Sequence, residues 1–89
     1  MEKRYTPELM KLAAGLIEKG IPFKFDTIFK GGIITVEENG EYKWDAICHE
    51  GSYGRKQGLL EIMGTLVDED NTGDTVEGFL TAEDILARL

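Results

Sequence analysis

Residues 23–48 alternate between apolar and polar side chains, and this alternation constrains the fold more than any other feature of the chain. A period of two residues is typical of β-strands that bury one face. Turn signals at Gly31–Gly32 and Asn39–Gly40 divide the stretch into three segments. We therefore expect a three-stranded antiparallel meander. Its predicted buried face comprises Phe23, Phe25, Phe29, Ile34, Val36, Tyr42, Trp44 and Ala46.

The two turns determine which residues face each other. Gly31–Gly32 suits a two-residue hairpin loop. At the second turn, a two-residue loop at Asn39–Gly40 would place Val36 opposite a lysine and mix apolar with charged positions. A three-residue loop over 38–40 places Val36 opposite Tyr42 instead. We favour this second register because it keeps one face of the sheet apolar.

Helix signals lie on both sides of the meander. Thr6 is a good N-cap residue for a first helix that ends at Gly20 and has an apolar stripe of Leu9, Leu12, Ala13, Leu16 and Ile17. The segment 58–64, "GLLEIMG", predicts a short second helix, because its four apolar residues fit one helical arc. Thr81 and Asp84 have the spacing of a capping box at the start of a last helix. We expect the residues between these two helices to form a loop.

The order helix, three strands, helix, helix indicates an α+β fold in two layers, with the helices on one face of the sheet. Eighty-nine residues suffice for a single domain, 1–89, with one modest core. No apolar run reaches the roughly 18 residues of a membrane span, and the first residues lack the apolar region of a signal peptide. A cytoplasmic location is therefore expected. Cys48 is the only cysteine, which excludes an intramolecular disulfide.

The net charge of −7 is concentrated in the last third of the chain. Residues 57–89 contain eight acidic residues and one basic residue, whereas residues 1–30 contain four acidic and six basic residues. An acidic surface repels the phosphates of nucleic acid, so direct nucleic-acid binding is not expected. It would attract a basic protein or a cation. The candidate partner-binding residues are Asp68, Glu69, Asp70, Asp74 and Glu77.

The acidic segment also contains the opening of a calcium-loop pattern. Asp68, Asp70 and Thr72, followed by Gly73, match the first ligand positions of an EF-hand loop. The bidentate glutamate that such a loop needs at its twelfth position is replaced by Phe79. We therefore favour a solvated acidic turn, with weak divalent-cation binding as the alternative. No cofactor is predicted.

A glycine-rich turn, 49–58, precedes the predicted second helix. Gly54, Arg55 and Lys56 would suit an anion bound at the start of that helix. The spacing of a phosphate-binding P-loop is missing from this turn. A tight connection from strand to helix is the simpler interpretation, and anion binding stays open as an alternative.

Familiar catalytic groups are sparse in the chain. Cys48 and His49 are adjacent, so on a strand their side chains would point to opposite faces. Ser52 could approach His49, but the sequence offers no clear orienting carboxylate for a catalytic triad. His49 is also the only histidine. We therefore expect a protein without enzymatic activity.

Two strings in the C-terminal half, "GSYGRKQGLLEIMG" and "VEGFLTAEDILARL", resemble short proteins encoded by phages and prophages of Gram-positive bacteria. The similarity consists of a Gly-Ser-Tyr-Gly turn, a Gly-Leu-Leu-Glu segment and a Leu-Thr-Ala-Glu-Asp segment within about residues 42–89. The resemblance brings no activity with it. It implies a bacterial cytoplasm and an accessory role.

These observations predict a small non-enzymatic phage or prophage accessory protein that binds another protein. Its most concrete form is an acidic mimic of nucleic acid that occupies the basic groove of a host nucleic-acid-handling enzyme. The alternative is a small-ligand or ion-binding domain that uses the anion or cation site described above. A homodimer also stays open, because isoleucines on the polar face of the sheet and Gly15 could form a contact.

Overall fold

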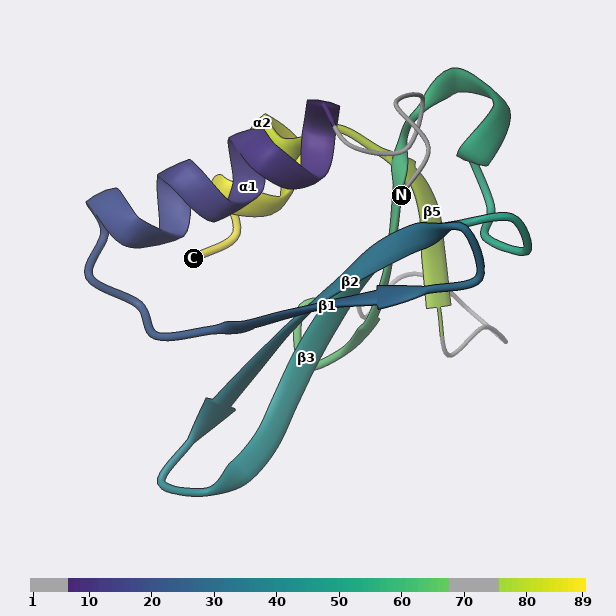
Figure 1. The fold of residues 1–89 in the computed structure, drawn as a ribbon. Coiled ribbons are helices and arrows are strands. Elements are labelled where there is room, and N and C mark those ends of the chain that lie inside the picture. Colours follow the sequence, from purple (N-terminus) through teal and green to yellow (C-terminus); the bar gives the residue numbers. More distant parts are fainter. Residues whose placement is uncertain (1–6, 68–75) are drawn as a thin grey trace.

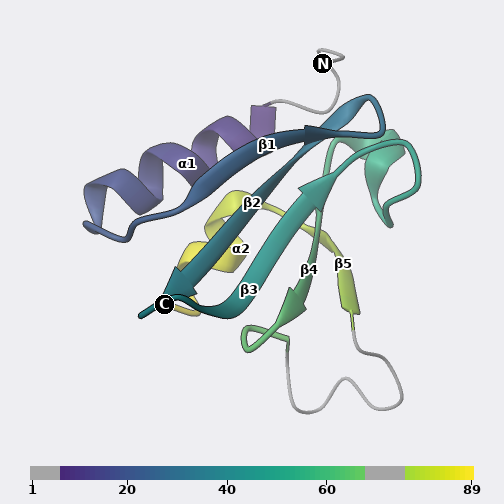
Figure 2. The same ribbon diagram turned by 60° about the horizontal axis from the view of Figure 1, so that its bottom comes forward.

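The computed structural model describes residues 7–67 and 76–89. Helices α1 (Pro7–Glu18) and α2 (Ala82–Leu86) pack together on one face of an antiparallel sheet (Figure 1). A second view shows both helices on the same side (Figure 2). The α+β class is therefore confirmed. Within the described residues, five strands pair in chain order: β1 (Lys24–Ile28), β2 (Gly31–Glu38), β3 (Glu41–Cys48), β4 (Leu60–Gly64) and β5 (Val76–Leu80).

The core lies between the helices and the sheet. The predicted stripe of the first helix is confirmed except at Ile17, which is 69% exposed. The two helices approach closely at Gly15, where a Cβ atom would lie 2.4 Å from Leu86 Cδ1. Glu8 of α1 also accepts a hydrogen bond from the Ala82 amide at 2.8 Å, which joins the two helices. The buried apolar residues are Leu9, Leu12, Ala13, Leu16, Ile34, Val36, Trp44, Ala46, Cys48, Leu60, Ile62, Leu80, Ala82 and Ile85.

Two strands replace a predicted helix and part of a predicted loop. The segment 58–64 contains strand β4 rather than a helix, and β5 lies in the expected loop. Within β4, Leu60 and Ile62 are buried toward the helices, while Glu61 and Met63 face the other side, which is a period of two. A short apolar run fits either helix or strand, and pairing with β3 decides between them. The predictions of three strands and of two C-terminal helices were therefore wrong.

The first hairpin turns at Phe29–Lys30 and not at Gly31–Gly32. Both turn residues have positive φ angles, 44° and 64°, and the register pairs Ile28 with Gly31. Gly31 is needed inside the strand instead, because a Cβ atom there would lie 1.9 Å from the carbonyl oxygen of Cys48. The prediction failed because the constraint on this glycine comes from a distant strand.

The second hairpin combines a two-residue turn with a β-bulge. Asn39 and Gly40 form the turn with positive φ angles of 56° and 79°. Val36 pairs with Trp44 and Glu37 with Tyr42, so Lys43 is the extra residue of β3. The expected three-residue loop was wrong because the bulge, rather than the loop, supplies the extra residue that keeps Val36 opposite an apolar partner.

Candidate functional site

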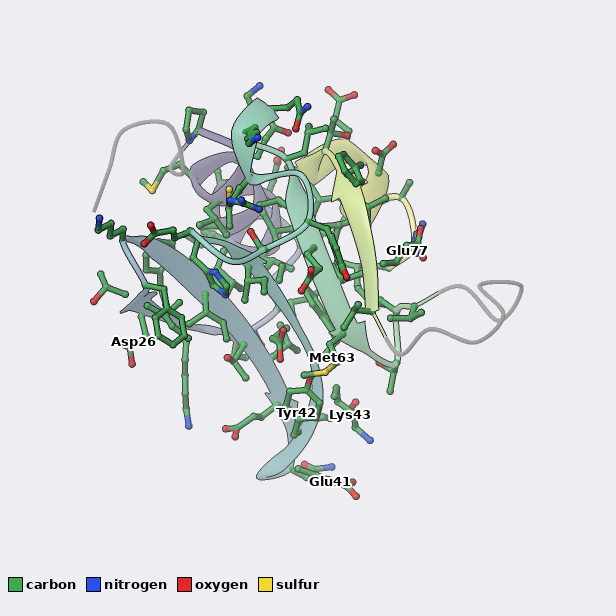
Figure 3. All side chains as sticks on the ribbon, turned by 90° about the vertical axis from the view of Figure 1, so that its right-hand side faces the viewer. Asp26, Glu41, Tyr42, Lys43, Met63 and Glu77 are labelled. Atoms are coloured by element: carbon green, nitrogen blue, oxygen red, sulfur yellow. The ribbon has the colours of Figure 1, made fainter. Side chains whose placement is uncertain are left out.

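The helix-free face of the sheet, which we call the outer face, carries a group of polar and apolar side chains. The bulge at Lys43 places Tyr42 on this face, and Figure 3 shows Tyr42 next to Met63. In the sheet register Asp45 lies opposite Met63, and Ile47 lies opposite Glu61. The outer face therefore combines aromatic, aliphatic and acidic side chains from neighbouring strands.

Asp45 is almost fully buried on this face, at 7% exposure. The Tyr42 hydroxyl donates to Asp45 Oδ2 at 2.8 Å and also lies 3.2 Å from the carbonyl oxygen of Met63. Burial raises the pKa of Asp45, and the hydrogen bond from Tyr42 opposes this rise. Burial, together with the nearby Asp45 carboxyl, raises the pKa of Tyr42 as well. The phenol therefore stays a hydrogen-bond donor at neutral pH.

Glu61 is the second nearly buried carboxylate of the outer face, at 9% exposure. Its Oε1 accepts a hydrogen bond from the Tyr53 amide at 3.0 Å, so the turn after β3 is held against β4. Gly78 lets this turn approach β5, because a Cβ atom at Gly78 would lie 2.5 Å from Tyr53 Cβ. The Tyr53 ring stays exposed. Two carboxylates with fixed hydrogen bonds thus lie among exposed tyrosine and methionine side chains.

We expect Asp45→Asn to make the protein more stable at neutral pH, with a smaller difference at acid pH. Burial raises the pKa of Asp45 in the folded chain. The stability that this group contributes is therefore present below its unfolded pKa and is lost as the pH rises through its folded pKa. Asparagine does not ionise, and its Oδ1 can still accept the bond from Tyr42. Urea unfolding of both proteins from acid to neutral pH measures the difference. A variant less stable than the native protein at neutral pH would contradict this expectation.

The predicted acidic site is described only at Glu77. Asp68, Glu69, Asp70, Thr72 and Asp74 lie outside the described residues, and with them the candidate calcium loop.

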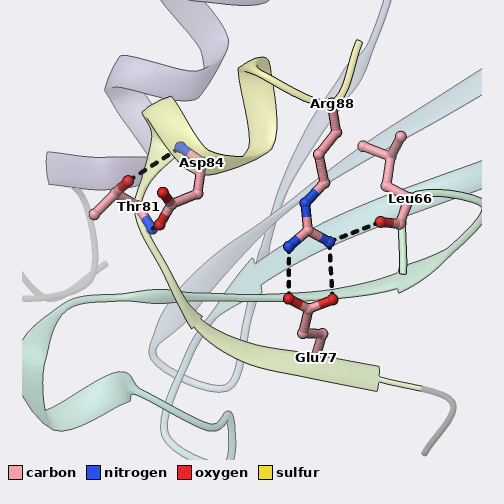
Figure 4. Close-up of polar contacts among 5 residues, drawn as sticks. All are labelled: Leu66, Glu77, Thr81, Asp84 and Arg88. Carbon is pink, nitrogen blue, oxygen red and sulfur yellow. Dashed lines mark hydrogen bonds and ion pairs between the residues drawn. The ribbon is translucent and has the colours of Figure 1, made fainter. Parts of the chain in front are cut away.

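Glu77 is held in an ion pair. The Arg88 guanidinium donates to both of its carboxylate oxygens, at 2.8 and 2.6 Å, and to the Leu66 carbonyl oxygen at 2.9 Å (Figure 4). This contact joins β5 to the end of the chain after α2. Figure 4 also shows the capping box of Thr81 and Asp84, which confirms the predicted start of the last helix.

The candidate anion site is a tight turn followed by a single 3₁₀ turn, η2 (Arg55–Gln57). Gly54 has a φ angle of 93°, and its carbonyl oxygen accepts bonds from the amides of Gln57 and Leu59. Arg55 Nη1 lies 3.4 Å from the carbonyl oxygen of Ser52, and Lys56 is exposed. The helix on which the anion prediction rested is absent, because the turn leads through three 3₁₀ residues into strand β4.

Cys48, His49 and Ser52 lie at the start of the same turn, and the last two hold it with hydrogen bonds. Cys48 is buried, and burial raises the pKa of its thiol to about 11. The Ser52 hydroxyl bonds to the backbone N–H and carbonyl of His49, and His49 Nδ1 accepts a bond from the Gly51 amide. The imidazole ring packs edge-on against Phe29 at a centroid distance of 5.4 Å. Within 7–67 and 76–89, no group of three or more His, Cys, Asp or Glu residues could hold a metal ion.

A hollow of about 380 Å³ lies at the end of the β2–β3 hairpin. Ile21 after α1, Trp44 of β3, Leu66 after β4 and Leu89 contribute to its apolar lining, with Lys43 also on its wall. The sequence did not indicate this hollow, because its lining comes from five separate segments that only the fold brings together.

Comparisons with family models, with curated proteins and with solved structures found no match for this chain. Among the described residues, no helix is long and apolar enough to cross a membrane.

Proposed function

We propose that this protein is a non-enzymatic binding module that recognises another protein through the outer face of its sheet. The observation that supports this most is the pair of nearly buried carboxylates, Asp45 and Glu61, beside exposed apolar side chains. Tyrosine and methionine are enriched at protein interfaces, and energetic hot spots cluster in desolvated pockets. The exposed side chains concerned are Tyr42, Tyr53 and Met63.

The chemistry of this face suggests a partner that inserts a basic side chain between apolar contacts. An arginine or lysine can bond to a carboxylate while its stem packs on an aromatic ring, and Asp45 beside Tyr42 offers both groups. The net charge of −7 would also speed the approach of a basic partner. We place this activity in the cytoplasm of a Gram-positive bacterium, where the resemblance to phage and prophage proteins implies an accessory role.

The test is affinity capture from a Gram-positive lysate with the native protein, Met63→Arg and Met10→Arg. Met63 is 44% exposed on the outer face, whereas Met10 is 58% exposed on α1 in the helical layer. We expect Met63→Arg to reduce retention of the partner at least about tenfold, because a charge placed in the contact costs more than 1.4 kcal/mol. Met10→Arg is expected to retain the partner at the native level.

Capture at two salt concentrations separates this proposal from acidic mimicry of nucleic acid. In the mimicry hypothesis, the groove of a nucleic-acid-handling enzyme binds the acidic residues Asp68, Glu69, Asp70, Asp74 and Glu77. That complex would be lost at moderate salt and would survive Met63→Arg. A partner retained equally by Met63→Arg and the native protein at both salts would contradict the outer-face proposal.

A further inference from the structure

Strand β1 is an edge of the described sheet and is regular along its whole length. It pairs with β2 over five consecutive residues without a shift in register. The other edge differs, because the β4–β5 register shifts and Phe79 in β5 has a φ angle of 60°. Bulged edges resist pairing with further strands, whereas straight edges permit it. Of the two described edges, β1 is therefore the one open to a further strand.

The hairpin turn determines which backbone groups of β1 point outward. A two-residue loop at Phe29–Lys30 makes Ile28 and Gly31 a hydrogen-bonded pair, so Asp26 also turns its amide and carbonyl toward β2. The alternate residues, Phe25 and Thr27, turn theirs away from the sheet. Consistent with this, the Thr27 amide donates to Asp26 Oδ1 at 3.1 Å, a side-chain bond in place of a strand partner.

We infer that β1 pairs antiparallel with β1 of a second copy of this chain, about a two-fold axis at Phe25. In this register Phe25 faces Phe25 of the second copy, and Lys24 of each copy faces Asp26 of the other. The outward backbone groups of residues 23, 25 and 27 would then form up to about six main-chain hydrogen bonds. Two opposite-charge pairs and one aromatic pair accompany them on the two faces.

Charge complementarity favours this register over its neighbours. An axis at Lys24 or at Asp26 would place like charges directly opposite each other, which destabilises a sheet. Those residues also point their backbone groups toward β2, so such an axis would lack hydrogen bonds at its centre. Pro22 belongs to the same alternating set as Lys24 and Asp26, whose backbone groups point toward β2. Its missing N–H therefore removes no hydrogen bond from the outer edge of β1.

Pairing would also give two exposed side chains of β1 new contacts. Phe25 is exposed in the single chain and would be covered by its copy. Asp26, which now accepts a bond from the Thr27 amide, would be released to bind Lys24 of the second copy. Lys24 Nζ already lies 2.9 Å from Glu37 Oε1. In the dimer it would therefore lie between the carboxylates of Glu37 and of Asp26 of the second copy.

This dimer goes beyond the proposed function and does not depend on it. It would join the two sheets into one and place both outer faces on the same side. Two contact surfaces per particle would raise the avidity for a repetitive partner.

The test is the molar mass in solution, measured by light scattering over a range of concentrations. We expect a dimer for the native chain, a monomer for Asp26→Lys and for Lys24→Asp, and a dimer again when both changes are combined. Glu41→Lys, at the tip of the β2–β3 hairpin, is the control for a change of charge and is expected to stay dimeric. A native chain that is monomeric at every concentration overturns the inference.

Thr27→Pro is the second variant, and it tests the direction of the backbone. Proline removes an outward N–H, so the β1–β2 ladder is kept while pairing with a second copy is lost. We expect a folded monomer by circular dichroism and light scattering. A folded Thr27→Pro protein that stays dimeric overturns the inference. Partner capture by this monomer reports separately on the outer face, so failure of the dimer and failure of the proposed function are distinguishable.

Discussion

Gly31→Ala is expected to destabilise the fold by at least about 3 kcal/mol, a large fraction of the whole stability of a small domain. A Cβ atom at this position would lie 1.9 Å from the Cys48 carbonyl oxygen and 2.6 Å from the His49 Cα atom. Both are backbone atoms, so no side-chain rotation relieves the overlap. β3 would have to move away from β2 to make room. Urea unfolding followed by the fluorescence of Trp44, the only tryptophan and a buried one, measures the loss.

Gly40→Ala is the matched control for this substitution. Gly40 has a φ angle of 79° in the second hairpin turn, and an added Cβ atom would meet nothing within 4 Å. Its expected cost is therefore only that of the left-handed backbone, about 1 to 2 kcal/mol. If Gly31→Ala costs no more than Gly40→Ala, the close approach of the two strands at Gly31 is wrong.

Gly31 also shows why the register of the β1–β2 hairpin was not predicted. Turn preferences are local, and Gly31–Gly32 is a strong local turn signal. The contact that requires Gly31 comes from Cys48, 17 positions along the chain, and no local pattern reports it. Phe29 and Lys30 form the turn instead, although residues of these types rarely adopt positive φ angles. Long-range packing therefore overrode the local preference.

Local signals were sufficient where the stabilising contacts are themselves local. The capping box of Thr81 and Asp84 is complete within four residues, and it begins α2 as predicted. The first helix likewise follows from its apolar stripe. Strands β4 and β5 depend instead on partners in other segments, so a short apolar run did not reveal them.

The outer face was predicted only in part. Trp44 and Ala46 were expected on the buried face, which assigns the alternate residues Asp45 and Ile47 to the polar face, and the structure places them there. Tyr42 was expected on the buried face, which is wrong, because the bulge at Lys43 shifts it by one position. The hydrogen bond between Tyr42 and Asp45 thus depends on a bulge that the alternation pattern alone does not reveal.

Arg88→Ala is expected to cost about 2 kcal/mol of unfolding free energy, which is below the value for a fully buried ion pair because both side chains keep some contact with water. Their exposures are 27% for Arg88 and 21% for Glu77. The change would leave the Glu77 carboxylate and the Leu66 carbonyl without the guanidinium that now binds both. A double-mutant cycle with Glu77→Gln measures the coupling directly by urea unfolding.

Arg55→Ala is the control for the loss of an arginine, because its 3.4 Å contact with the Ser52 carbonyl is long and single. Its expected cost is within about 0.5 kcal/mol. Additive effects of Arg88→Ala and Glu77→Gln would contradict the coupling.

Glu77 was also predicted to bind a partner, and the Glu77→Gln variant separates partner binding from a role in stability. If its carboxylate serves the fold through Arg88, Glu77→Gln lowers stability while partner capture stays at the native level.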